Sequence, residues 1–246
     1  MSRWPTFATD EIEAVIKVLQ SGKVNYWTGE QVEAFEEEFS NAVNARYGIA
    51  VANGSVAIEL ALRSINIKPN DEIIVTCRSF IASASSIVNA GGIPVFADVD
   101  LETQNISATT IQKVISNKTR AILCVHLNGW PCDMDPIIDL AREKNLLVIE
   151  DCAQAHGARY KGRPVGALGD IACWSFCQDK IISTGGEGGM VTTNNRDLWS
   201  KMWSYKDHGK SIKQIKRTPK KEGFRWLHDN IGTNWRLTEI QAAIGR

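Results

Sequence analysis

Residues 170–194 read DIACWSFCQDKIISTGGEGGMVTTN, and this stretch decides the fold. Residues 171–176 form a short apolar and aromatic run of the length expected for a buried strand. The glycine-rich segment 185–189 lets the backbone turn sharply into a second strand over 190–193. We therefore predict a strand, a turn that carries Lys180, a glycine loop and a second strand.

Lys180 is the candidate reactive residue of this stretch. It follows Phe176 within four residues, so we expect it to project from the end of the strand. Burial between a strand end and a bare glycine loop lowers the pKa of a lysine, and a neutral amine forms a Schiff base with an aldehyde. The alternative is an ordinary surface lysine in a turn.

The composition is that of an ordinary globular protein. The chain has 246 residues, of which 43% are hydrophobic and 23% charged, and its net charge is zero. This balance favours neither nucleic acid nor an anionic membrane as a partner. Serines, glycines and a proline interrupt the uncharged stretch 79–97, so it is a poor membrane span. The acidic N-terminal segment does not resemble a signal peptide, and we expect a cytoplasmic protein.

The cysteine pattern gives little support for a metal site. No C-x-x-C pair is present, and several cysteines lie in apolar runs. We predict buried free thiols in a reducing compartment and no metal. The six cysteines are Cys77, Cys124, Cys132, Cys152, Cys173 and Cys177.

The rest of the chain alternates between strand and helix patterns, which predicts an α/β fold with a mostly parallel sheet covered by helices on both faces. In such sheets ligands lie beyond the carboxyl ends of the strands. The predicted strands are 48–52, 71–77, 93–99, 120–127, 146–150 and 171–176, and the predicted helices between them are 55–66, 79–90, 107–116 and 134–144.

We expect one large domain over 1–246, with a helical segment over 1–46 and a basic loop over 206–231. Six basic residues and no acid lie between Lys210 and Lys221, which indicates either a solvated loop or a mobile loop that meets the phosphates of a substrate. Residues 236–246 form an amphipathic helix pattern at the end of the sequence. Its apolar positions need a surface to cover, so we expect a C-terminal continuation to be missing.

Three predicted strand ends carry candidate ligand-binding residues. Gly54 and Ser55 open a helix, where free N–H groups and a hydroxyl suit a phosphate, although an ordinary N-cap serine gives the same pattern. Asp151 follows a fully apolar strand, so it needs a cation such as a protonated pyridine nitrogen, a structural ion pair or a helix end to cap. Gln154 could then bond a phenolic oxygen. Phe80 is either a ring that stacks on a planar cofactor or a core residue.

Two other kinds of cofactor-binding loop are excluded because the sequence lacks their motifs. A dinucleotide loop needs G-x-G-x-x-G before a helix, whereas residues 185–189 lead into a strand. The phosphate loop of nucleotide triphosphatases needs G-x-x-x-x-G-K-[ST], and Gly22-Lys23 is followed by valine.

Several motifs together resemble the DegT/DnrJ/EryC1/StrS family, whose members are sugar aminotransferases of fold type I that use pyridoxal 5'-phosphate (PLP). The resemblance extends from the N-terminal helix to Arg246. The motifs are Asn53-Gly54-Ser55, Phe80, the run EDCAQAHG over 150–157, Ser175 through Lys180, GEGG over 186–189 and Gly232 through Arg236.

The resemblance implies a role for each candidate residue. Lys180 would carry PLP as a Schiff base, Asp151 would face the pyridine nitrogen and Gln154 would lie near the ring hydroxyl. Phe80 would stack on the ring. The phosphate would lie in a cup made by Gly54, Ser55 and Ser175, and Asn234 would reach the phosphate of a partner subunit in a homodimer.

The implied reaction transfers an amino group from an amino acid such as glutamate to a keto group of a nucleotide-linked deoxysugar. The lysine at position 180 favours this outcome over sugar dehydration, because relatives that dehydrate carry histidine there. Ser55 stands where the family usually has threonine, and residues 177–179 differ from the common pattern. The resemblance also implies a smaller C-terminal domain, which we expect to be missing, so a catalytically silent binding or regulatory chain is the other alternative.

Overall fold

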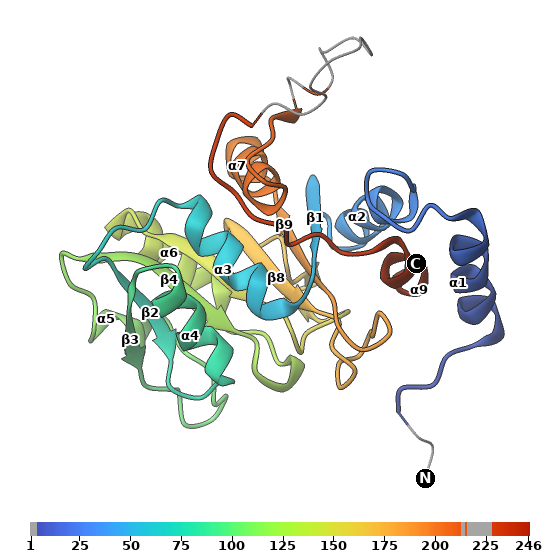
Figure 1. Ribbon diagram of the computed structural model, residues 1–246. Coiled ribbons are helices and arrows are strands. Elements are labelled where there is room, and N and C mark those ends of the chain that lie inside the picture. Colours follow the sequence, from blue (N-terminus) through green and yellow to red (C-terminus); the bar gives the residue numbers. More distant parts are fainter. Residues whose placement is uncertain (1–3, 213–214, 216–227) are drawn as a thin grey trace.

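The computed structural model describes residues 4–212, 215 and 228–246 and centres on one seven-stranded sheet (Figure 1). Its strands are β1 (Tyr47–Val51), β2 (Glu72–Thr76), β3 (Ile93–Ala97), β4 (Thr119–Val125), β5 (Leu147–Asp151), β8 (Ile171–Ser175) and β9 (Gly189–Thr193). They lie in the order β1-β9-β8-β5-β4-β2-β3. Only β9 runs antiparallel to its neighbours, so the prediction of a mostly parallel sheet is confirmed.

Helices surround this sheet (Figure 1). They are α1 (Thr9–Ser21), α2 (Gln31–Ala42), α3 (Gly54–Ser64), α4 (Ile81–Asn89), α5 (Ala108–Gln112), α6 (Met134–Lys144), α7 (Arg196–Lys206) and α9 (Glu239–Gly245). Helix α3 packs on β8 and β9, α6 packs on β5, and α2 packs on β1. Beyond the β1 edge, α9 packs against both α1 and α2 (Figure 1).

Two predicted helices differ from the observed ones. The pattern over 107–116 predicts a helix of ten residues, but α5 ends at Gln112 and a turn follows in which Ser116 N–H donates to Thr119 Oγ1 at 3.0 Å. The last helix begins at Glu239, because Thr238 adopts extended backbone and caps the N-terminus of α9. A small hairpin of β6 (Arg159–Tyr160) and β7 (Arg163–Pro164), the 3₁₀ turn η1 (Leu127–Gly129) and helix α7 were not predicted.

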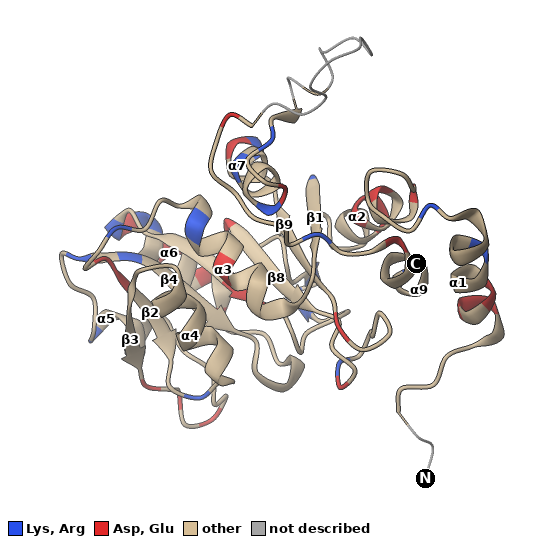
Figure 2. Cartoon of the chain, in the orientation of Figure 1, with Lys and Arg blue, Asp and Glu red and all other residues tan. Residues whose placement is uncertain are grey.

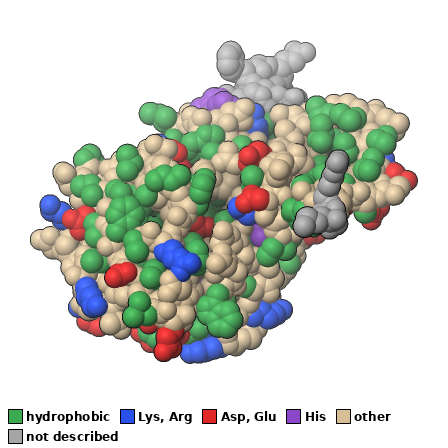
Figure 3. Space-filling view, turned by 90° about the horizontal axis from the view of Figure 1, so that it is seen from below, with side chains coloured by type: hydrophobic (Ala, Val, Ile, Leu, Met, Phe, Trp, Pro, Cys, Tyr) green, Lys and Arg blue, Asp and Glu red, His purple; other side chains and the backbone are tan. Residues whose placement is uncertain are grey.

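The core lies along the sheet, and charged residues lie mainly on the helices and loops around it (Figure 2). All six cysteines are free, and four of them are buried. Cys77 is exposed and Cys177 half-buried, so the prediction that the thiols are buried is wrong for these two. Hydrophobic side chains also reach the surface in several places on the face seen in Figure 3. Among the described residues, no helix combines the length and apolar character that a membrane span requires.

Most of the predicted basic loop lies outside the described residues. Its one described basic residue in the 210–221 stretch is Lys210, which is only 6% exposed. Lys210 Nζ lies 2.9 Å from Asp207 Oδ1. For Lys210 the structure thus indicates an ion pair within the fold.

Candidate active site

The strand ends bring most of the candidate residues to one edge of the sheet. Strands β1, β5 and β8 run in the same direction, so the segments after Val51, Asp151 and Ser175 emerge at the same edge. Strand β9 starts at this edge, where Gly189 lies opposite both Val51 and Ser175 in register. This arrangement places the glycine loop beside the start of α3.

The start of α3 forms a close cradle with the end of β8. A Cβ atom added at Gly54 would lie 2.6 Å from Ser175 Cβ, and one at Gly189 would lie 2.5 Å from the carbonyl oxygen of Asn53. Asn53 is the N-cap, and its side chain accepts the N–H of Val56 at 2.9 Å. Ser55 is exposed and does not cap the helix, so its interpretation as an ordinary N-cap is wrong. The helix N-terminus and two serines thus provide donors suited to a phosphate.

Asp151 is buried at the end of β5, with 7% of the residue exposed. Its Oδ1 accepts the N–H of Ala153 at 3.1 Å, and its Oδ2 accepts the hydroxyl of Ser83 at 3.2 Å. Burial raises the pKa of this carboxyl above its ordinary value, and these two donors oppose the effect. Both donors are neutral, so the carboxylate is well placed to bind a cation.

Lys180 lies in the turn after β8, and only 18% of its side chain is exposed. This side chain is thus less exposed than that of an ordinary surface lysine. Its Nζ lies 2.7 Å from Oδ2 of Asp179, whose side chain is 66% exposed. Lys180 is close enough to Asp151 to lower the pKa of that carboxyl. The side chain is thus mostly shielded from solvent, but its amine is paired with a surface carboxylate, whereas the sequence predicted a desolvated amine.

Phe80 and Gln154 are both exposed beside this edge. Phe80 is the N-cap residue of α4, and its 76% exposure shows that the core alternative is wrong. Gln154 Oε1 accepts the N–H of Asn128 at 2.7 Å, which fixes its side chain to the loop after β4. Both side chains are therefore accessible to a ligand at the strand edge, and the amide nitrogen of Gln154 remains available as a donor.

Asn234 lies on a segment that contacts the end of α7 and the end of β1. Its backbone forms an isolated antiparallel bridge with Asp207. The next residue, Trp235, accepts the N–H of Ala52 at 2.9 Å, just after β1 ends. The side chain of Asn234 is exposed, so it points away from the core of this chain.

Sequence reasoning missed a buried polar cluster behind Asp151. His126, Glu150 and Cys152 converge there, and each is fully buried. His126 Nε2 bonds Glu150 Oε2 at 3.0 Å, and the glutamate also accepts backbone N–H groups at Gly166, Leu168 and Gly169. These bonds already occupy both carboxylate oxygens, which makes the cluster a structural unit and a poor metal site. His126 follows β4 whereas Glu150 and Cys152 lie at the end of β5, so no sequence spacing signals that the histidine meets the other two.

The residues at the strand edge fit PLP. A buried carboxylate with neutral partners suits a protonated ring nitrogen, and a largely buried lysine suits an aldehyde. The cradle between Gly54 and Ser175 suits a phosphate, because any larger residue at Gly54 would fill it. The site therefore offers one group each for the ring nitrogen, the aldehyde and the phosphate of PLP.

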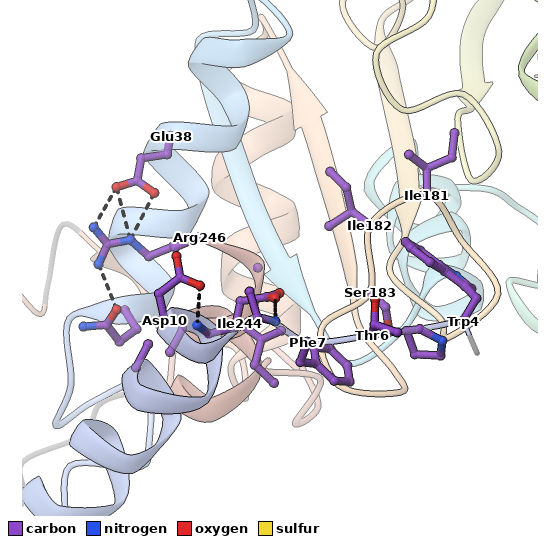
Figure 4. Close-up of a pocket in the computed structure, with 17 residues that line it drawn as sticks. Trp4, Thr6, Phe7, Asp10, Glu38, Ile181, Ile182, Ser183, Ile244 and Arg246 are labelled. Carbon is purple, nitrogen blue, oxygen red and sulfur yellow. Dashed lines mark hydrogen bonds and ion pairs between the residues drawn. The ribbon is translucent and has the colours of Figure 1, made fainter. Parts of the chain in front are cut away.

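A separate cavity of about 630 Å³ lies between the N-terminal segment, α1 and α9 (Figure 4). Ile181, Ile182 and Ser183 line it directly after Lys180, and Arg246 lines its other side. The Arg246 guanidinium bonds Glu38 at 2.7 Å (Figure 4). Lys180 and Asp151 are not among the described residues that line this cavity, so it is distinct from the strand-edge site.

Comparisons with known proteins identify the family of this chain. The model of the DegT/DnrJ/EryC1/StrS aminotransferase family matches residues 5–246. The chain is 42% identical to a GDP-perosamine synthase of Escherichia coli over 241 residues, which is 98% of this chain and 63% of that protein. It is 40% identical to a dTDP-3-amino-3,6-dideoxy-alpha-D-galactopyranose transaminase of Aneurinibacillus thermoaerophilus over 234 residues, or 94% of this chain and 60% of that protein.

A solved structure gives the same result. The aminotransferase from Psychrobacter cryohalolentis superposes with a TM-score of 0.97 at 57% sequence identity. The match covers 100% of this chain and 62% of that one, so the chain spans less than two thirds of the length of these relatives. The chain belongs to the DegT/DnrJ/EryC1/StrS aminotransferase family.

Proposed function

We propose that the protein is a PLP-dependent aminotransferase that transfers an amino group from an amino acid such as glutamate to a keto group of a nucleotide-linked deoxysugar. The observation that carries the proposal is that buried Asp151 and mostly shielded Lys180 follow neighbouring parallel strands at one edge of the sheet, beside the cradle of Gly54 and Ser175. Relatives named for GDP-linked and dTDP-linked sugars support the substrate class.

Each residue has a defined task in this proposal. When bound, PLP supplies an electron sink that stabilises negative charge at the α-carbon of the amino donor. Lys180 would hold the cofactor covalently through its amine, and the same amine would serve as the base for the proton on that α-carbon. Asp151 would keep a proton on the ring nitrogen, because a buried carboxylate strongly stabilises a positive charge beside it.

The remaining residues bind and orient. Ser55, Ser175 and the N-terminus of α3 hold the phosphate, Phe80 covers one face of the ring and Gln154 bonds the ring hydroxyl. We also propose a homodimer in which Asn234 reaches the phosphate site of the partner subunit. The exposed side chain of Asn234 supports this role. The cytoplasmic location stays a prediction from the sequence.

A visible absorbance spectrum tests the proposal. We expect a band when PLP is added to the purified chain, and we expect glutamate to bleach it as the amino group moves to the cofactor. Lys180→Ala should fold normally, as judged by circular dichroism, and give neither the band nor turnover. Glutamate-dependent transamination retained by Lys180→Ala would contradict the role of this lysine.

A further inference from the structure

Two serine hydroxyls connect Asp151 to the loop that follows β2. Ser83 Oγ lies 3.2 Å from Oδ2 of Asp151, and Ser79 Oγ lies 2.7 Å from Ser83 Oγ. A hydroxyl group has one proton to donate. Because Ser83 gives its proton to the carboxylate, Ser79 is the donor within the serine pair. Both hydrogen bonds therefore point toward Asp151.

The carboxylate is held at both of its oxygens. Ala153 N–H donates to Oδ1 and Ser83 donates to Oδ2, so each oxygen has one fixed neutral donor. Ser83 is only 2% exposed, and a hydrogen bond in such a poorly solvated place is stronger than one at the surface. Loss of the Ser83 hydroxyl would leave one oxygen of the carboxylate without this donor.

Several titratable groups face Asp151. Lys180 favours its ionised form, and His126 and the thiols of Cys152 and Cys173 also lie close enough to interact with it. Burial raises the pKa of Asp151, and the hydroxyl of Ser83 is one of the groups that oppose this rise. Removal of that hydroxyl leaves the other groups in place and makes the carboxyl bind its proton more tightly.

We propose that Ser83 is a positioning residue for Asp151 and that Ser79 acts through it. The inference rests on the proposed function, in which Asp151 meets the protonated ring nitrogen. Ser83 sets the direction in which the carboxylate faces and keeps it ionised. Ser79 directly precedes Phe80, so the same hydroxyl pair ties the segment that carries the exposed ring to the carboxylate.

The test measures the proton affinity of Asp151 without cofactor. The chain is labelled with ¹³C at the aspartate carboxyl carbons, the Asp151 signal is identified as the one lost in Asp151→Asn, and its shift is followed by NMR as a function of pH. Ser83→Ala should raise the midpoint by about one pH unit, a tenfold gain in proton affinity. Ser83→Thr should restore the wild-type midpoint, and Ser79→Ala should give a smaller rise.

Ser86 provides a matched control on the same helix. It is also 2% exposed, but its hydroxyl donates to the carbonyl oxygen of Ser55 at 3.2 Å. Ser86→Ala should therefore leave the Asp151 midpoint unchanged. If Ser83→Ala fails to fold, Ser83→Cys keeps the volume with a weak donor and should also raise the midpoint.

An Asp151 midpoint that is the same in wild type and in the Ser83 variant would overturn the inference. An equal shift in Ser86→Ala would overturn it too, because the effect would then come from loosening of α4. A wild-type chain that takes up no PLP would instead contradict the proposed function. The two failures are distinct, since the NMR titration needs no cofactor.

Discussion

His126 Nε2 lies 3.0 Å from Oε2 of Glu150, and neither side chain is exposed to solvent. The N–H of Cys132 donates to Nδ1 of the same ring at 3.1 Å, so the ring proton is on Nε2 and is donated to the glutamate. Glu150 also holds the loop that precedes β8 through three backbone N–H groups, at Gly166, Leu168 and Gly169. One buried carboxylate thus fixes two loops directly behind Asp151.

Removal of this carboxylate should destabilise the fold. We expect Glu150→Ala to lower the free energy of unfolding by about 3 kcal/mol or more, because it leaves several buried donors without an acceptor. Glu150→Gln retains an acceptor oxygen and should cost less. Urea unfolding followed by circular dichroism measures both variants. A loss below about 1 kcal/mol in Glu150→Ala would show that the cluster relaxes easily.

The pH dependence of stability gives a second test of Glu150. Burial alone would raise the pKa of this carboxyl, but the bonds from His126 and the backbone outweigh it and leave the pKa below the usual 4.5. A carboxyl with a lower pKa in the folded state adds stability above its unfolded pKa and loses it as the pH falls through the folded value. The stability difference between wild type and Glu150→Gln should thus shrink below pH 4.5. A constant difference down to about pH 3 would contradict this prediction.

Gly54 should be essential for binding the phosphate. In Gly54→Ala the new Cβ would lie 2.6 Å from Ser175 Cβ, so the two sides of the cradle must separate. We expect PLP to bind about tenfold or more weakly, which corresponds to about 1.4 kcal/mol or more. Fluorescence titration with PLP measures the affinity.

Gly48 offers a matched control for this variant. A Cβ at Gly48 would lie 2.6 Å from the backbone oxygen of Glu36, so Gly48→Ala introduces a similar clash on β1. Both variants should lose stability, at a cost of about 1–3 kcal/mol. Only Gly54→Ala should lose affinity for PLP. Equal affinities in the two variants would argue against a phosphate at this cradle.

Glu36 should make the fold less stable as the pH rises. Burial raises its pKa to about 7, although the nearby charge of Lys206 opposes the shift. The folded protein then holds a proton that the unfolded chain releases, so wild type should lose stability relative to Glu36→Gln between pH 4.5 and about 7. Thermal unfolding across this range measures the trend. Glu37 is an exposed neighbour on α2, so the stability difference between wild type and Glu37→Gln should stay constant across this pH range.

The strand and helix pattern could be predicted because each element carries its own signal. Local features predict the strand edge that holds Asp151. These features are the apolar runs that form β5 and β8 and the Asn53-Gly54-Ser55 segment at the start of α3. The exposure of Phe80 and the capping role of Asn53 were not predictable, because the residue type alone does not say whether a side chain is buried, exposed or bonded to a helix end. Only packing decides between them.

The contacts that Ser83 makes with Asp151 and that His126 makes with Glu150 could not be predicted for a different reason. These residues come from α4, the loop after β4 and β5, and they meet only once the sheet order is fixed. Likewise, the pairing of Lys180 with Asp179 depends on the conformation of a turn. Nothing in the local pattern distinguishes such a pair from two solvated charges.

Lys180 is central to the proposed function, and its covalent bond to PLP can be measured directly. The chain is incubated with PLP, reduced with borohydride to make the bond permanent, digested and mapped by mass spectrometry, with Lys180→Arg as the control. We expect the reduced cofactor on the peptide that contains Lys180 and on no other peptide at stoichiometric yield. Cofactor on other lysines at the same yield, or unchanged labelling in Lys180→Arg, would contradict the proposal.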